Sequence, residues 1–113
     1  MENYSVLKLY ASTTDKINNE LFYEQIVYLA KEKKISGVTV YRGVMGYGQS
    51  SKHVNTSRFW ELVEKLPVVI EMVDKTEKIE EFYNSIEPEL LSMPKGCMVY
   101  LESINMKLLK KGN

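Results

Sequence analysis

The amino-acid sequence predicts an α+β fold whose elements follow one another in the order β-α-β-β-α-β. Two observations predict this order. Four segments have the alternation or the β-branched composition of strands, and two segments have apolar residues at helical spacing. Each helix lies between two of the strands, so the chain consists of two βαβ halves. Two right-handed halves of this kind form a four-stranded antiparallel sheet with both helices on one face.

The first half begins with a strand over residues 4–11, where Leu7, Leu9 and Ala11 alternate with Val6, Lys8 and Tyr10. Residues 12–19 are expected to form a loop. The next segment, 19–34, is predicted to be helical because apolar residues recur on one helix face, at Phe22, Ile26, Leu29 and Ala30. Lysines in its last turn suit the helix dipole, and Ser36-Gly37 is expected to end it.

The second strand is predicted over residues 38–47, "VTVYRGVMGY". Strict alternation along it would place Arg42 among the apolar side chains of Val38, Val40 and Val44. We therefore expect a β-bulge at Arg42-Gly43, after which Val40 and Met45 share a face while Arg42 leaves it. Residues 49–65 fit no clean period.

The second half begins with a β-branched, apolar strand over residues 66–74, and Pro67 lies at its start, where a missing N–H is tolerated. Asp74 and Glu77 resemble a capping box for the second helix. The apolar face of that helix consists of Ile79, Phe82, Tyr83 and Ile86, and Pro88 is expected to end or kink it. A turn at 94–96 leads to the last strand, 97–108, and to a tail that we expect to be frayed.

This arrangement is the ferredoxin-like fold, and its helices cover only one face of the sheet. The strand over 66–74 nevertheless has apolar residues on both faces, at Val68, Val69, Ile70, Met72 and Val73. The sequence contains no third layer. The second face is therefore expected to be covered by further copies of the chain.

Length and composition limit the remaining possibilities. A chain of 113 residues suits one domain over 1–113, with no apolar run near the roughly 18 residues of a membrane span. Fifteen basic and fifteen acidic residues give no net charge, which argues against a nucleic-acid binder that acts through a broad positive field. A single cysteine and an N-terminus without a basic region favour the cytoplasm.

The stretch "GVTVYRGVMGYGQSS", residues 37–51, holds four of the six glycines, at Gly37, Gly43, Gly46 and Gly48. Two interpretations stay open. The strand exit can require positive φ, which glycine tolerates. Alternatively, backbone N–H groups at Gly46 and Gly48 can face an anion, as in other glycine-rich nests.

Together with "LPVVIEMVDKTEKIEEF", this stretch is similar to the DUF190 family, a branch of the PII-like trimeric signalling proteins. The residues that match the PII pattern are Gly37, Thr39, Val40, Gly46, Tyr47 and Gly48. The resemblance implies a homotrimer packed through its sheets, with a small anionic ligand, such as an adenine nucleotide, in clefts between subunits. It also implies regulation of a partner, such as a membrane transporter or channel, rather than an enzymatic reaction.

The resemblance and the side chains together give a set of candidate ligand-binding residues: Thr39, Arg42, Gly46, Tyr47, Gly48, Gln49, Ser50, Lys95 and Gly96. Arg42 can pair with a ligand phosphate or carboxylate, or with an acid across a subunit contact. The candidate partner-docking loop contains Ser51, Lys52, His53 and Arg58. These residues are equally consistent with a solvated, mildly basic loop.

The chain also departs from the PII pattern. PII proteins bind phosphates with a Gly-Asp-Gly-Lys segment and arginines after the second helix, where this chain has only Lys95-Gly96 and no arginine. A smaller anion, or a nucleotide held by different residues, remains open. The alternatives are a divalent-metal-handling trimer of the cation-tolerance type and a structural subunit without a ligand.

No catalytic residue, metal site or required cofactor is predicted. The lone His53 has no metal-ligand spacing around it, and Ser50 and Ser51 lack the orienting group and oxyanion site of a hydrolase. Cys97 is expected to be a small buried apolar residue.

Overall fold

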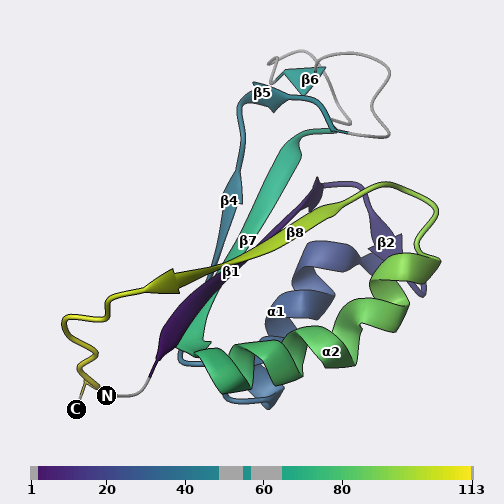
Figure 1. Cartoon of the computed structure of the whole chain (residues 1–113). Coiled ribbons are helices and arrows are strands. Elements are labelled where there is room, and N and C mark those ends of the chain that lie inside the picture. The colour runs from purple at the N-terminus through teal and green to yellow at the C-terminus, as the bar shows by residue number, and fades with distance from the viewer. Residues whose placement is uncertain (1–2, 49–54, 57–64, 113) are drawn as a thin grey trace.

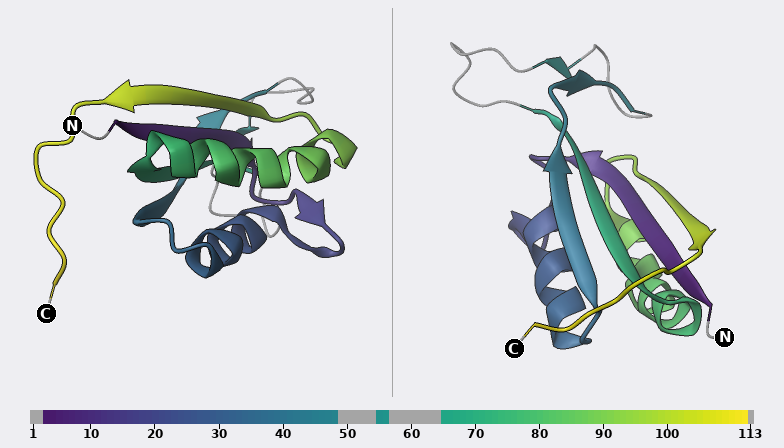
Figure 2. Two further views of the ribbon diagram at one scale, coloured as in Figure 1. Left: turned by 60° about the horizontal axis from the view of Figure 1, so that its bottom comes forward. Right: turned by 90° about the vertical axis from the view of Figure 1, so that its left-hand side faces the viewer.

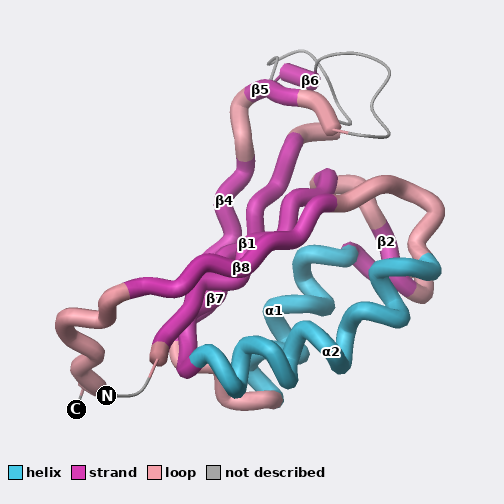
Figure 3. The backbone as a smooth tube through the Cα atoms, viewed as in Figure 1, coloured by secondary structure: helices cyan, strands magenta, loops and turns pink. Residues whose placement is uncertain are grey.

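The computed structural model describes residues 3–48, 55–56 and 65–112. Its strands and helices are shown in Figures 1 and 3. They follow one another in the order β1 (Tyr4–Ser12), β2 (Lys16–Ile17), β3 (Glu20–Leu21), α1 (Phe22–Glu32), β4 (Gly37–Arg42), β5 (Met45–Gly46), β6 (Asn55–Thr56), β7 (Pro67–Lys75), α2 (Thr76–Ser92) and β8 (Met98–Ile104).

The four long strands form one antiparallel sheet in the order β4-β7-β1-β8. Both helices lie on the same side of this sheet, as Figure 2 shows when the sheet is seen on edge. This is the ferredoxin-like βαββαβ fold that the sequence predicts. We call the side that carries the helices the inner face of the sheet and the opposite side the outer face.

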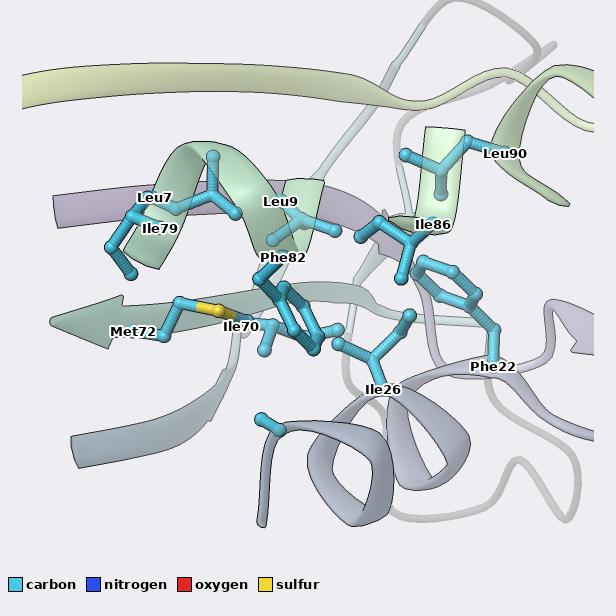
Figure 4. Packing of buried hydrophobic residues seen from close by; sticks show 11 residues of the cluster. Leu7, Leu9, Phe22, Ile26, Ile70, Met72, Ile79, Phe82, Ile86 and Leu90 are labelled. Carbon is cyan, nitrogen blue, oxygen red and sulfur yellow. The ribbon is translucent and has the colours of Figure 1, made fainter. Parts of the chain in front are cut away.

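The core lies between the inner face and the helices. Buried and partly exposed residues alternate along the central parts of β1 and β7, where Leu7, Leu9, Ile70 and Met72 are at most 1% exposed. Figure 4 shows these side chains under the sheet, facing those of the two helices. The buried helix residues are Phe22, Ile26, Ala30, Ile79, Phe82, Ile86 and Leu90. The predicted apolar faces are therefore confirmed for both helices, although Leu29 and Tyr83 are only partly buried.

Helix α1 is shorter than predicted at both ends. It stops at Glu32 because the N–H of Ile35 donates to the carbonyl of Ala30 and the N–H of Lys34 to that of Lys31. This pair of hydrogen bonds is a Schellman motif. The left-handed residue that the motif requires is Lys34, with φ of 62°, so Gly37 does not end the helix.

A small hairpin replaces the loop expected over 12–19. Strands β2 and β3 pair across Asn18 and Asn19, whose φ angles are 51° and 67°. Two-residue turns with positive φ at both positions favour asparagine. The carboxylate of the buried Asp15 accepts the N–H of Ser12 at 2.9 Å, which fixes the chain where it leaves β1.

Helix α2 differs from the prediction at both of its marked positions. The capping box is wrong: the N-cap is Lys75, without a side-chain cap. Asp74 instead accepts the N–H of Ser36 at 2.9 Å and so ties β7 to the start of β4. Pro88 does not end the helix, which continues to Ser92. A proline within a helix leaves the carbonyl four residues earlier without its helical partner.

The predicted bulge in the second strand is also wrong. β4 pairs with β7 without interruption from Gly37 to Arg42, and the N–H of Gly43 still donates to Pro67 O at 2.8 Å. The chain then leaves the sheet, and β5 pairs with β6 instead. Met45 therefore does not share a sheet face with Val40, although Arg42 is exposed as expected.

The last strand ends at Ile104, earlier than predicted, and residues 105–112 have no regular secondary structure. They run away from the sheet at the end where the N-terminus lies (Figure 1). Within the described part of the chain, no helix is long and apolar enough to cross a membrane.

Candidate functional site

The fold leaves the outer face of the sheet without a covering layer of helices or strands (Figure 2). Because residues opposite one another in the register share a face, it is formed by alternate residues of all four strands. These residues are Tyr4, Val6, Lys8, Tyr10, Thr39, Tyr41, Val69, Glu71, Val73, Met98, Tyr100, Glu102 and Ile104. Most are apolar or aromatic, and Tyr41 and Met98 are 52% and 54% exposed. Exposed apolar surface of this kind marks an interaction site.

A cluster of polar and aromatic side chains interrupts the apolar surface in the middle of the outer face. Lys8 Nζ lies 3.9 Å from a carboxylate oxygen of Glu71 and 5.9 Å from the ring centroid of Tyr100. The rings of Tyr10 and Tyr100 stack with centroids 5.8 Å apart, and their hydroxyls are 3.3 Å apart. The hydrogen bond between the hydroxyls of Tyr10 and Tyr100, followed by burial, raises the pKa of Tyr10. A partner on this face therefore has to match a directional polar centre as well as an apolar surround.

Arg42 and Lys95-Gly96, which the sequence predicts as ligand contacts, lie at the same end of the sheet but at opposite edges. Arg42 is the last residue of β4, and Lys95-Gly96 precede β8. Strands β7 and β1 run between them. Three strand spacings amount to about 14 Å. One subunit does not bring these residues together.

Thr39 and Arg42 also fail to share a face. Thr39 lies opposite Glu71 on the outer face, whereas Arg42 lies opposite the buried Val68 on the inner side, beyond the core. A single small ligand in one subunit cannot contact both side chains from the same side of the sheet.

The glycine stretch is explained in part by a neighbouring proline. A Cβ on Gly46 would lie 3.0 Å from Pro67 Cγ, and one on Gly43 would lie 3.3 Å from Pro67 Cβ. A Cβ on Gly48 would have no heavy atom within 4 Å, and Tyr47 is 76% exposed. None of the described glycines has positive φ, so the expectation that the strand exit requires it is wrong. The backbone does approach another group closely at Gly43 and Gly46, but that group is the Pro67 side chain of the same chain and not a ligand.

Six predicted site residues lie outside the described residues: Gln49, Ser50, Ser51, Lys52, His53 and Arg58. The roles proposed for them stay predictions. Among the residues that the structure describes, no group of three or more His, Cys, Asp or Glu side chains could hold a metal ion. Cys97 is only partly buried, and burial raises the pKa of its thiol, which favours the unreactive protonated form.

Sequence reasoning missed the roles of the two buried carboxylates, Asp15 and Asp74. Asp74 accepts hydrogen bonds from the N–H groups of Lys75 and Ser36 and lies 3.3 Å from Lys78 Nζ. Burial raises the pKa of Asp74, but these donors outweigh it and hold the pKa below its ordinary value. Asp15 holds the start of the β2–β3 hairpin. All their partners are structural, so both carboxylates stabilise the fold.

Two solved structures of PII-like proteins have a similar fold. A PII-like signalling protein from Thermus thermophilus is 11% identical, with a TM-score of 0.63 over 91% of this chain and 88% of that one. CPII, a nitrogen regulatory PII-like protein from Thiomonas intermedia bound to ADP, AMP and bicarbonate, is 14% identical, with a TM-score of 0.60 over 90% and 88%. At such identities the likeness concerns the fold.

A protein outside the PII group is equally similar. The divalent ion tolerance protein CutA1 from Ehrlichia chaffeensis is 12% identical, with a TM-score of 0.62 over 96% of this chain and 87% of that one. Fold likeness therefore does not choose between signalling and metal handling.

Sequence comparison is more specific. A UPF0166 protein from Aquifex aeolicus is 33% identical over 99 residues, which are 85% of this chain and 93% of that protein. A second, from Methanocaldococcus jannaschii, is 40% identical over 91 residues, 80% and 79% of the two chains. The family DUF190, described as "Uncharacterized ACR, COG1993", matches residues 4–106, and the chain belongs to this family.

Proposed function

We propose that this chain is a PII-like regulatory subunit of the cytoplasm. It forms one domain over residues 1–113 and assembles as a homotrimer through the outer face of its sheet. It binds a small anionic ligand, such as an adenine nucleotide, in the clefts between subunits, and it makes or breaks no bond. The ligand changes how the subunit engages a partner, for which a membrane transporter or channel is the candidate.

The observation that carries this proposal is the uncovered outer face. Its apolar side chains stand on the same strands that build the core, and no helix or strand of the described chain covers them (Figure 2). Packing against other copies would remove this surface from water, at roughly 25 cal/mol for each Å² of apolar area. A homo-oligomer is the simplest assembly that provides such a cover.

Assembly would also account for the separation of the predicted ligand contacts. Arg42 and Lys95 lie at opposite edges but at the same end of the sheet. When copies are placed around an axis, the β4 edge of one copy can face the β8 edge of the next. Arg42, Tyr47 and Gly48 from one subunit and Lys95-Gly96 from another would then flank a shared cleft. The nucleotides bound to the similar CPII protein have the negative charge that these cations favour.

Residues 49–60 are the proposed docking segment for the partner, with Lys52, His53 and Arg58 facing an acidic surface. This segment follows directly on Tyr47-Gly48. Ligand contacts at these residues would favour some conformations of the segment over others, which is how a ligand shifts a population.

The alternative is a trimer that handles divalent cations, which the likeness to CutA1 favours. The described residues offer no cluster of metal ligands, so such a site would need side chains from outside them or from several subunits. A structural subunit without a ligand is the second alternative.

Multi-angle light scattering combined with isothermal titration calorimetry tests the proposal. We expect a trimer that binds ADP or AMP without added metal. Arg42→Gln and Lys95→Gln should each weaken binding roughly tenfold or more, because each removes a charge-assisted hydrogen bond. Lys107→Gln, at the other end of the sheet, is the matched control. Binding of Zn²⁺ or Cu²⁺ without any nucleotide would favour the cation-handling alternative, and a trimer that binds neither would favour the structural subunit.

A further inference from the structure

The helix layer contains a groove that the proposed function does not use. It lies between α1, α2 and the β2–β3 hairpin and has a volume of about 370 Å³. Its apolar part is formed by Ile17, Ile26, Leu29 and Ile86. This volume falls within the range of roughly 300–1,000 Å³ that is typical of ligand sites. We call it the helix groove. It opens on the side of the molecule opposite to the outer face, so the two surfaces can be occupied at once.

The helix groove is acidic. Glu20 and Glu89 line it together with the amides of Asn18 and Gln25, and no Lys or Arg is among its described lining residues. The helices around it carry seven glutamates and only two lysines. The whole chain has no net charge, so the lysines and arginines that balance these glutamates lie in other parts of the chain. The occupant that fits has apolar side chains flanked by positive charge.

A segment with this chemistry exists in the same chain. Residues 105–112, "NMKLLKKG", which we call the C-terminal arm, contain three lysines and no acid. Leu108 and Leu109 are 77% and 52% exposed. Two neighbouring leucines at this exposure offer apolar surface that a partner can cover.

The arm and the helix groove lie at opposite ends of the molecule. The arm follows β8 at the end of the sheet where β1 begins, whereas the β2 hairpin that forms one wall of the groove is at the other end (Figure 1). The sheet runs the whole length between them. Eight extended residues reach at most roughly 29 Å, and the principal extents of the described structure are 48, 29 and 25 Å. An arm that enters a groove therefore belongs to a different copy of the chain.

We propose that the C-terminal arm of one copy docks in the helix groove of another. Leu108 or Leu109 packs against Ile17 and Leu29, the partly buried apolar residues of the groove, while Lys110 and Lys111 pair with Glu20 and Glu89. The contact joins different surfaces of the two copies, so it links assemblies head to tail. It needs neither the outer face nor any ligand, and its failure would leave the proposed function standing.

Photo-crosslinking of the full chain tests the proposal. A photoreactive benzoylphenylalanine replaces Leu108, and equal amounts of ¹⁴N- and ¹⁵N-labelled protein are mixed before irradiation. Mass spectrometry should find crosslinks to α1 or α2 near the helix groove, with mixed labels that show two different copies. The same group at Val44, which is 74% exposed, is the control and should give no groove crosslinks. Crosslinks only within one copy, only to the outer face, or none between copies would overturn the proposal.

A second test reverses the charges of the proposed ion pairs and leaves the buried residues unchanged. Glu20→Lys with Glu89→Lys, or Lys110→Glu with Lys111→Glu, should each lower the groove crosslink yield about fivefold to tenfold, since surface pairs become repulsive. Combining all four substitutions should restore at least half of the yield. All four positions are exposed, so the circular dichroism spectrum should not change. An unchanged yield in either pair, or no recovery in the combination, would contradict the assignment of the arm to this groove.

Discussion

The two faces of β7 differ although their residues alternate along one strand. On the inner face, Val68, Ile70 and Met72 are at most 1% exposed, and Ile70 and Met72 form the core with the helices. On the outer face, Val69 and Val73 have similar side chains and no covering layer. Apolar character alone therefore does not assign a residue to the core. The inner face is used in folding, whereas the outer face remains available for assembly.

The largest effect is expected at the inner face. Ile70→Ala should lower the free energy of unfolding by about 2 to 5 kcal/mol, because it removes buried methyl groups and leaves a cavity. Urea denaturation followed by circular dichroism measures this change. The matched variant is Val69→Ala on the outer face, which should cost less than half as much at a concentration where the protein is monomeric. Equal losses would mean that the two faces do not differ in the way described.

An outer-face charge should separate assembly from folding. Val69→Glu places a carboxylate in the apolar row that Tyr41, Tyr10 and Met98 complete. Burial of an unpaired charge between copies should weaken association about a hundredfold or more. Sedimentation equilibrium measures the association, and the far-UV spectrum should keep its native shape. An assembly of unchanged affinity would show that copies do not meet on this face.

The two carboxylates of β7 extend the comparison to charge. Asp74 is buried with three donors around it, whereas Glu71 is partly exposed beside Lys8. Asp74→Asn should destabilise the fold by about 1 to 2 kcal/mol at pH 7, and Glu71→Gln in the monomer should have an effect near zero. Thermal unfolding of both variants measures the difference.

The same pair predicts a pH dependence. The folded-state pKa of Asp74 is lowered, so its contribution is complete above its unfolded pKa of about 3.9 and is lost as the pH falls through the folded value. The wild-type chain should therefore lose stability in acid more steeply than Asp74→Asn. A difference between the two chains that stays constant from pH 7 to pH 2 would contradict this account.

The smallest change in stability is expected where the glycine stretch contacts Pro67, the first residue of β7. Gly46→Ala should cost about 1 kcal/mol, because the new methyl group would lie 3.0 Å from Pro67 Cγ and one of the two must move. Gly48→Ala meets open space and should be nearly neutral. If the order is reversed in thermal unfolding, Gly48 has a constraint that the isolated chain does not show.

Sequence periodicity predicted the parts of this fold that depend on burial. The strand over 66–74 and the apolar face at Phe22, Ile26 and Ala30 follow from solvent exclusion alone, and both are confirmed. The position of the uncovered face also follows from the alternation, because both faces of β7 are apolar.

Local and long-range contacts were harder to predict. The Asn18-Asn19 turn has a recognisable signal, two residues that tolerate positive φ between short polar-apolar pairs, although the segment as a whole predicts a loop. The contact of Gly43 and Gly46 with Pro67 depends on the register between β4 and β7, which no local pattern in either segment encodes. The candidate ligand residues occupy opposite edges of one sheet, and adjacency in sequence gives no information about which edges of different copies meet.

The anchors on either side of residues 49–64 have a consequence for how the protein can change over time. Pro67 O accepts the N–H of Gly43 at 2.8 Å, while Leu66 and Thr13 exchange hydrogen bonds of 2.9 and 3.1 Å. Departure and return of the main chain are thus both tied to the sheet. Both anchors are made by residues outside the stretch, so a change of sequence between them need not alter these hydrogen bonds as the protein diverges.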